Sequence, residues 1–134
     1  GFDDTFLVPH SRYGHIDIDK INACEELVAL AGSERVGAYL IKNKSGSQVY
    51  ITGHPEYDAH TLKGEYLRDQ EKSADAPKPE NYFPDDNPDN EPSKTWQSHA
   101  FLLFSNWLNY YVYQTTPYDI NLVSQDVRTN NYAE

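Results

Sequence analysis

Short apolar runs separated by polar turns fill the first half of the chain, a pattern typical of strands. The run at residues 27–31 is apolar throughout, as in a strand that is covered on both faces. The turn at residues 43–47 is rich in Asn, Ser and Gly and predicts a β-hairpin. A short helix is predicted over residues 18–25, where apolar side chains recur at helical spacing. Strands are predicted at residues 6–8, 27–31, 38–41 and 49–52.

A more polar helix is predicted after these runs. Asp58 is a suitable cap for a helix that continues to about Lys72, and Leu62 and Tyr66 lie four residues apart on one of its faces. Gly64 weakens this helix by about 1 kcal/mol relative to alanine. The alternation of short strands and helices predicts a mixed α/β fold.

The rest of the chain combines a proline-rich loop with an apolar helix. Residues 74–97 hold five prolines among Asp and Asn residues, so we expect a long ordered loop that Tyr82 and Phe83 hold against the surface. Residues 98–113 are apolar nearly all round, as in a helix that is covered on more than one side or shared with a partner. The last residues of the polar tail, 114–134, are expected to fray.

Composition and charge narrow the choice of partners. The chain has 134 residues and a mass of 15.4 kDa, which fits one domain or part of one. Lys and Arg number 11 against 21 Asp and Glu, and the net charge of −10 disfavours nucleic acid and anionic membranes as partners. The sequence has neither an apolar run long enough to span a membrane nor a signal-like start. We therefore expect a soluble, cytoplasmic protein.

Cysteine and histidine usage points to no disulfide and no metal. Cys24 is the single cysteine, which excludes an internal disulfide and a cysteine-rich zinc site and fits a reducing compartment. The five histidines lack a ligand spacing. No glycine-rich turn surrounds Cys24 to supply an oxyanion hole, so we expect a small buried apolar residue there and not a nucleophile.

The segment Gly53-His54-Pro55-Glu56 carries the clearest chemistry. Pro55 disfavours the helical region for His54, so the segment is expected to be extended, with His54 and Glu56 on the same side at the end of a strand. A carboxylate there fixes the imidazole tautomer and leaves the other ring nitrogen free to act as a base. The alternative is an ordinary turn in which His54 is a partly exposed loop residue.

Several longer motifs resemble the homoserine O-acyltransferases of methionine biosynthesis. They occur in order along most of the chain, with spacing like that of the family. They are PHSRY at residues 9–13, TGHPEYDA at 52–59 followed by Glu65 and Arg68, NYFP at 81–84, and FSNWLNYYVYQTTPYD at 104–119. The resemblance implies a three-layer α/β sandwich like that of class I glutamine amidotransferases (flavodoxin-like), of which this chain is the C-terminal portion with a β-hairpin and an aromatic-rich helix.

The resemblance also implies an activity and the residues that carry it. Family members move an acyl group from succinyl-CoA or acetyl-CoA to the hydroxyl of L-homoserine through a cysteine thioester. His54 matches the general base, Glu56 its orienting carboxylate, Arg68 the arginine that binds the amino-acid carboxylate, and Ser11 a position that contacts homoserine. No bound cofactor is implied, and the family is homodimeric.

Each of these assignments has an ordinary alternative. Arg68 can be a surface residue paired with Glu65 on the same helix, and Ser11 can be a simple turn residue. The family nucleophile precedes the PHSRY motif, so we expect residues 1–134 to be the C-terminal part of one acyltransferase domain, inactive alone. A serine O-acyltransferase, an amidotransferase-like hydrolase that shares His-Pro-Glu, and a non-catalytic interaction fragment remain competing functions.

Overall fold

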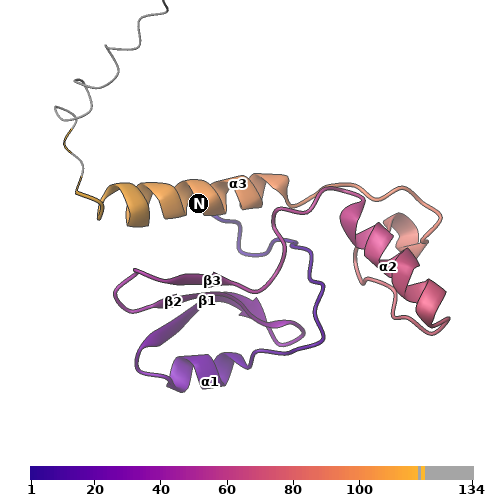
Figure 1. Cartoon of the computed structure of the whole chain (residues 1–134), viewed down its shortest axis with the longest axis horizontal. Helices are drawn as coiled ribbons and strands as arrows, with labels where there is room; N and C mark the ends of the chain where they lie inside the picture. The colour runs from indigo at the N-terminus through magenta and orange to yellow at the C-terminus, as the bar shows by residue number, and fades with distance from the viewer. Residues whose placement is uncertain (118, 120–134) are drawn as a thin grey trace, which may run out of the picture.

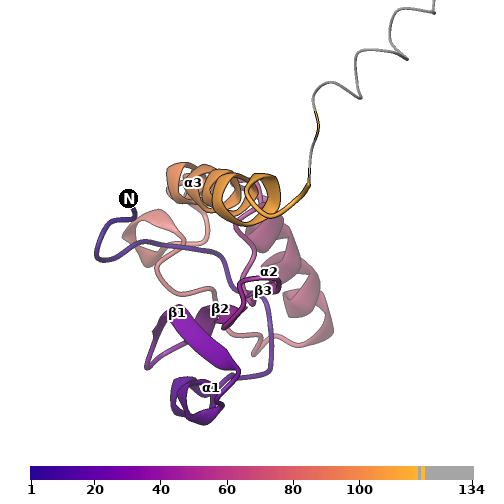
Figure 2. The same ribbon diagram turned by 90° about the vertical axis from the view of Figure 1, so that its left-hand side faces the viewer.

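A three-stranded antiparallel sheet with helices on both sides forms the centre of the computed structural model, which describes residues 1–117 and 119. Figures 1 and 2 show α1 and α3 on opposite sides of the sheet, with α2 set to one side. The predicted mixed α/β class is confirmed. The elements are α1 (Ile18–Ala23), β1 (Leu27–Ser33), β2 (Gly37–Asn43), β3 (Val49–Ile51), α2 (Thr61–Lys72), a 3-10 turn (Pro84–Asp86), α3 (Gln97–Trp107) and a π-helical turn (Leu108–Tyr113).

The central strand β2 supplies most of the buried side chains of the sheet. It pairs with β1 on one edge and β3 on the other, so its backbone groups are bonded on both sides. Tyr39 and Leu40 form the core cluster with Leu103 of α3. The prediction that residues 27–31 are buried was wrong, because β1 is an edge strand and its Leu30 is 48% exposed.

The predicted hairpin is confirmed between β2 and β3. Leu40 pairs with Ile51 and Lys42 with Val49 in an antiparallel register. Gly46 lies in the turn with φ of 76°, a backbone conformation that side chains with a Cβ rarely adopt. The hairpin therefore directs the chain after Ile51 toward the segment that carries His54.

The predicted strand at residues 6–8 is wrong. This segment makes no ladder, and it packs on the sheet through side chains instead. The ring of Phe6 contacts Tyr39 edge-on at a centroid distance of 5.9 Å and stacks on His99 at 5.1 Å. An apolar run that lies across a sheet looks the same in sequence as one that joins it.

Helix boundaries follow local capping. The carboxylate of Asp17 accepts a hydrogen bond from the Asp19 N–H at 2.8 Å, and α1 ends at Ala23, two residues before its predicted end. Asp58 accepts hydrogen bonds from the His60 and Thr61 N–H groups at 2.8 and 2.9 Å, as expected of a cap, but the helix begins only at Thr61, with His60 at the N-cap position. Helix α2 ends at Lys72 with Leu62 and Tyr66 buried, which confirms the predicted helix and its apolar face.

The predicted apolar helix is present as α3 and its π-helical continuation. Other described residues bury few of its side chains. Leu103 is its one buried residue in α3. Exposed fractions reach 75% for Phe101 and 71% for Tyr113. None of the helices in the described part of the chain is long and apolar enough to cross a membrane.

Aromatic side chains hold the proline-rich loop against its neighbours, as expected for Tyr82 and Phe83. Phe83 is 5% exposed and Trp96, at its end, is 4% exposed. The Tyr82 hydroxyl donates a hydrogen bond to the Ala59 carbonyl. The expected fraying of the tail lies outside the described residues from position 120 onward.

Gly53 occupies a position where two segments approach too closely for a side chain. A Cβ there would lie 2.9 Å from the Pro9 carbonyl oxygen and 3.1 Å from the Tyr39 ring. Both neighbours are fixed, one as backbone and one as a buried core residue. The contact between the strand end and the segment around Pro9 therefore requires glycine.

Gly53→Ala is expected to lower the free energy of unfolding of the full-length protein by about 1–3 kcal/mol through overpacking. Gly64→Ala is the matched control, because a Cβ at that position of α2 meets nothing within 4 Å. This control should raise stability by about 1 kcal/mol through helix propensity. Denaturant unfolding measures both changes, and an unchanged midpoint for Gly53→Ala would contradict the close approach.

Candidate active site

Two backbone segments from distant parts of the sequence meet where β3 ends. The Thr52 N–H donates to the Tyr39 carbonyl at 2.9 Å, which extends the pairing with β2 one residue beyond the strand. The His54 N–H then donates to the Pro9 carbonyl at 2.8 Å. Pro9, Gly53 and Pro55 are buried, so the backbone that carries His54 is fixed on both sides.

His54 and Glu56 are in contact, as the sequence predicts. The Nδ1 of His54 donates to the Oε1 of Glu56 at 2.9 Å, and both side chains are partly exposed. The backbone reason differs from the expected extended segment. The Tyr57 N–H donates to the His54 carbonyl at 3.2 Å, so residues 54–57 form a turn with Pro55 at its second position. The turn brings the two side chains together.

The imidazole of His54 is thus oriented for proton transfer. A carboxylate on Nδ1 holds the proton on that nitrogen and directs the lone pair of Nε2 outward. No hydrogen bond to Nε2 is found within the part of the chain that the structure describes. This arrangement can remove a proton from a thiol or hydroxyl group placed within hydrogen-bond reach of Nε2.

Tyr57 lies against His54, a contact that sequence reasoning missed. The two rings are nearly parallel, with a centroid distance of 4.3 Å and an interplanar angle of 15°. The Tyr57 hydroxyl donates to the Oε1 of Glu65 at 2.8 Å. Tyr57 directly follows the pair formed by His54 and Glu56, which we call the dyad. Glu65 lies one helical turn before Arg68. Only the folded structure shows that Tyr57 and Glu65 are in contact.

Glu65 and Ser11 meet at the same tyrosine. The second oxygen of Glu65, Oε2, is buried and has no hydrogen-bond partner among the described residues. The side chain of exposed Ser11 lies near the Tyr57 phenol oxygen and favours its ionised form. Burial and Glu65 outweigh this effect and raise the pKa of Tyr57 to about 12. Tyr57 therefore stays a neutral hydrogen-bond donor at physiological pH.

Arg68 lies on α2, as Glu65 does, but makes no contact with the dyad. Its Nε donates to the Oδ1 of the adjacent Asp69 at 3.0 Å, and 55% of its side chain is exposed. It is therefore not paired with Glu65, although Glu65 and Tyr13 lie within its electrostatic range. An exposed ion pair of this kind contributes about 0–1 kcal/mol, so the guanidinium can move to another anion at little cost.

His10 is a second imidazole beside the dyad. Its ring packs edge-on against Tyr39 at a centroid distance of 5.7 Å, and Arg12 donates to its Nδ1 at 3.4 Å. Its Nε2 is buried without a partner among the described residues. Burial, then Arg12 and His54, lower the pKa of His10 to about 4. His10 is therefore neutral at physiological pH.

The dyad is partly exposed, with 34% of the His54 and 58% of the Glu56 side chain accessible. Hollows of about 710 and 770 Å³ lie elsewhere among the described residues. His10 lines both hollows, whereas His54 lines neither. A reaction at Nε2 of His54 thus needs groups from outside the described residues to enclose it.

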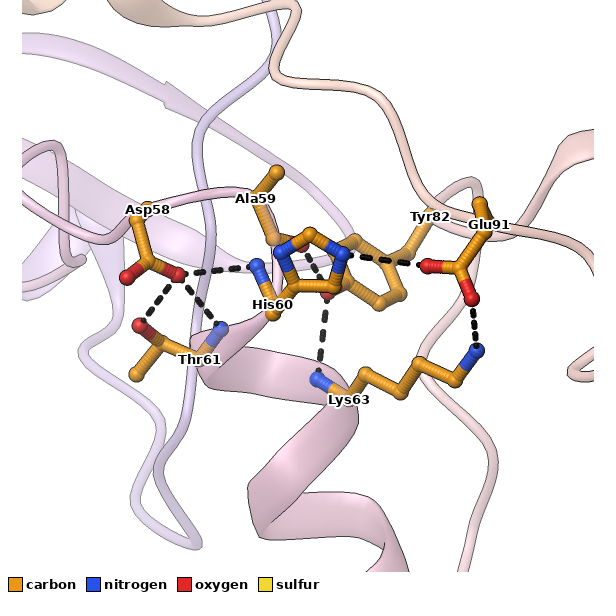
Figure 3. Close-up of polar contacts among 7 residues, drawn as sticks. All are labelled: Asp58, Ala59, His60, Thr61, Lys63, Tyr82 and Glu91. Carbon is orange, nitrogen blue, oxygen red and sulfur yellow. Dashed lines mark hydrogen bonds and ion pairs between the residues drawn. The ribbon is translucent and has the colours of Figure 1, made fainter.

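A polar network joins the start of α2 to the proline-rich loop (Figure 3). The Lys63 N–H donates to the Tyr82 hydroxyl at 3.1 Å. Glu91 accepts from the Nε2 of His60 at 3.0 Å and from the Nζ of Lys63 at 3.4 Å. The Trp96 indole N–H donates to the Tyr57 carbonyl at 3.0 Å. The loop thereby fixes the helix that carries Glu65 and Arg68 relative to the dyad.

Cys24 differs from its expected placement. It is exposed at the end of α1, so the prediction of a buried apolar residue was wrong. The helix ends before it, and the chain turns toward the edge strand β1, which leaves the side chain uncovered. Within residues 1–117 and 119, no group of three or more His, Cys, Asp or Glu side chains is placed to hold a metal ion.

Comparisons with known proteins give one consistent family. The family model described as homoserine O-succinyltransferase matches residues 1–118. The chain is 85% identical over its whole length to the homoserine O-succinyltransferase of Pseudoalteromonas translucida, of which it covers 42%. It is 52% identical over 95% of its length to the homoserine O-acetyltransferase of Petrotoga mobilis, of which it covers 41%. The chain therefore spans about two fifths of these relatives.

Tyr82→Phe should loosen the first turn of α2, because the Lys63 N–H and the Ala59 carbonyl both lose their partner. We expect amide hydrogen exchange at Lys63 in the full-length protein to accelerate about tenfold. Glu91→Gln is the control, since it weakens only exposed contacts and should leave that amide protected. Unchanged exchange at Lys63 in Tyr82→Phe would contradict the network.

His10→Gln should reduce the acid sensitivity of the full-length protein. Because the pKa of His10 is about 4 in the folded chain and ordinarily 6.5, the folded state binds fewer protons between these values. Stability from this group is complete above pH 6.5 and is lost as the pH falls toward 4. Allowing for its partial exposure, the loss is about 1–2 kcal/mol. Denaturant unfolding at several pH values measures this loss. If the free energy of unfolding of His10→Gln fell with pH as steeply as that of the wild type, the lowered pKa of His10 would be refuted.

Proposed function

Because the chain belongs to the homoserine O-succinyltransferase family, we propose that it is part of an enzyme of methionine biosynthesis that transfers a succinyl group from succinyl-CoA to the hydroxyl of L-homoserine. The hydrogen bond of 2.9 Å between His54 and Glu56 carries this proposal, since it gives an oriented base at the position where the family motif stands. The chain supplies this base and the contacts to the amino-acid substrate.

His54 serves two proton transfers in the proposed reaction. In the first half, it takes the proton of a cysteine thiol outside this chain, the thiolate attacks the thioester carbonyl of succinyl-CoA, and CoA leaves with a proton returned by His54. In the second half, it takes the proton of the homoserine hydroxyl, and the alkoxide attacks the enzyme thioester. The cysteine leaves as a thiolate and takes this proton back from His54, and O-succinylhomoserine forms. Such a base accelerates a reaction by about 10²–10⁴.

Glu56 orients the base and balances its charge. Its carboxylate keeps the proton on Nδ1 and stabilises the imidazolium that forms in each half-reaction. The hydrogen bond is between partly exposed groups, so its effect depends on water being excluded when the rest of the enzyme encloses the dyad.

Arg68 and Ser11 are the proposed contacts to homoserine. The planar guanidinium of Arg68 binds a carboxylate with two parallel hydrogen bonds, for which it exchanges its bond to Asp69. Ser11 lies near Tyr57 and two residues after Pro9, whose carbonyl accepts from the His54 N–H, so its hydroxyl is suited to contact the substrate close to the base. These roles rest on the family motif together with these contacts.

We also propose that residues 1–134 form the C-terminal part of a single three-layer domain of the class I glutamine amidotransferase type, with the loop at 74–97 on its surface. The partial exposure of the dyad supports this proposal, as do the exposed apolar side chains of α3. That helix face suits contact with the rest of the domain or with a second copy in a homodimer. The nucleophile and the acyl-CoA pocket belong to the rest of the domain.

Acetyl-CoA is the second candidate donor, because the Petrotoga mobilis relative is named an acetyltransferase. A serine acceptor or a hydrolase of the same fold is less well supported, since the matched relatives are named for homoserine. A non-catalytic interaction fragment remains the alternative from another class, motivated by the exposed face of α3.

In the full-length enzyme, His54→Ala should abolish both thioester formation and transfer to homoserine, with each rate falling at least about 10²-fold. Arg68→Lys should mainly raise the homoserine KM, by about tenfold, and leave thioester formation near normal, because lysine keeps the charge but loses the paired hydrogen bonds. Stopped-flow acylation with succinyl-CoA or acetyl-CoA and steady-state kinetics with homoserine measure these effects and identify the donor.

Residues 1–134 alone serve as the control for the placement of the nucleophile. Incubated with succinyl-CoA and homoserine, they should form no product, and turnover would assign the nucleophile to this chain. If Arg68→Lys blocked thioester formation while homoserine binding stayed intact, the role given to Arg68 would be wrong.

A further inference from the structure

We infer that Tyr57 is a positioning residue with two separable parts: its ring fixes the plane of the His54 imidazole, and its hydroxyl fixes the side of the site that receives homoserine. This inference rests on the proposed function, since it concerns the base and the substrate contacts of that reaction. It starts from the two groups that Tyr57 contacts, His54 and Glu65, and from the nearby Ser11.

The ring of Tyr57 removes the rotation that the Glu56 contact leaves open. A hydrogen bond at Nδ1 fixes one edge of the imidazole, but the ring can still tilt about that bond. A nearly parallel aromatic ring at a centroid distance of 4.3 Å covers one face and opposes such a tilt. Together the two contacts define where Nε2 points.

Tyr57 is itself held at three points. Its N–H donates to the His54 carbonyl at 3.2 Å, and its carbonyl accepts from the Trp96 indole at 3.0 Å. Its hydroxyl donates to Glu65 at 2.8 Å, which reaches across to α2. A ring anchored at its backbone and at its far end makes a rigid support for its neighbour.

The hydroxyl of Tyr57 lies near the residues that are proposed to contact homoserine. It donates to Glu65, one helical turn from Arg68, and Ser11, the proposed contact to homoserine, lies near its oxygen. Removing the hydroxyl alone frees the Glu65 side chain while leaving the ring on His54. Removing the ring frees His54 as well. The two substitutions thus separate the two parts.

The test uses the full-length enzyme with Tyr57→Phe and Tyr57→Leu. Tyr57→Phe should form the cysteine thioester within about twofold of the wild-type rate and raise the homoserine KM about five- to tenfold. Tyr57→Leu should slow both half-reactions about 10- to 100-fold, the usual effect of a misplaced catalytic group. Equal thioester rates in wild type and Tyr57→Leu would overturn the role of the ring, and an unchanged KM in Tyr57→Phe would overturn that of the hydroxyl.

Tyr50→Leu is the matched control, because Tyr50 is an exposed tyrosine of β3 whose hydroxyl bonds only to Gln48 among the described residues. It should leave both half-reactions unchanged. The outcomes also separate the inference from the proposed function. If the wild-type enzyme forms no O-acylhomoserine, the function fails. If it does and Tyr57→Leu acylates normally, only the positioning role fails.

A spectroscopic measurement keeps the inference testable if Tyr57→Leu does not fold. The ring of Tyr57 should shift the His54 Cε1–H proton resonance upfield in the wild-type enzyme, and His54→Ala identifies that resonance by its loss. Tyr57→Phe should keep the upfield position. A wild-type resonance at the position of an unstacked histidine would overturn the inference.

Discussion

The hydrogen bond from the His54 N–H to the Pro9 carbonyl, 2.8 Å long, is the constraint on which the site depends. It ties the end of the hairpin to a segment that belongs to no strand, and Gly53 makes this approach possible because it has no side chain. Ser11 and His10 follow Pro9, so the same bond brings them to the dyad. It is the direct backbone link between the segment that carries Ser11 and the residue that carries the base.

A second constraint places α2. The loop has no regular strand or helix between residues 74 and 96 apart from one short turn, yet Phe83 and Trp96 are buried and the Tyr82 hydroxyl bonds to the first turn of α2. Buried aromatic side chains offset the entropy lost in ordering such a loop. The apolar side chains of α3 stay largely exposed among the described residues, which indicates that its packing depends on partners outside them.

Sequence patterns predicted the elements that local chemistry defines. The turn glycine Gly46 and the cap Asp58 act on neighbours a few residues away, and the hairpin and α2 were predicted correctly for that reason. The segment at 6–8 and the exposure of Cys24 were predicted wrongly, because an apolar residue or run carries no record of what covers it. For Arg68, the helix on which it lies was predicted, but its hydrogen bond to Asp69 was not.

The sequence by itself determined the family, the class of fold and the contact between His54 and Glu56, because motifs and a two-residue spacing act locally. Only the tertiary structure decided that a turn makes this contact, that Tyr57 stacks on the imidazole, and that its hydroxyl donates to Glu65 near Ser11. These contacts join segments brought together by one backbone hydrogen bond and a buried loop. Such long-range contacts depend on the packing of the whole chain, which no local pattern encodes.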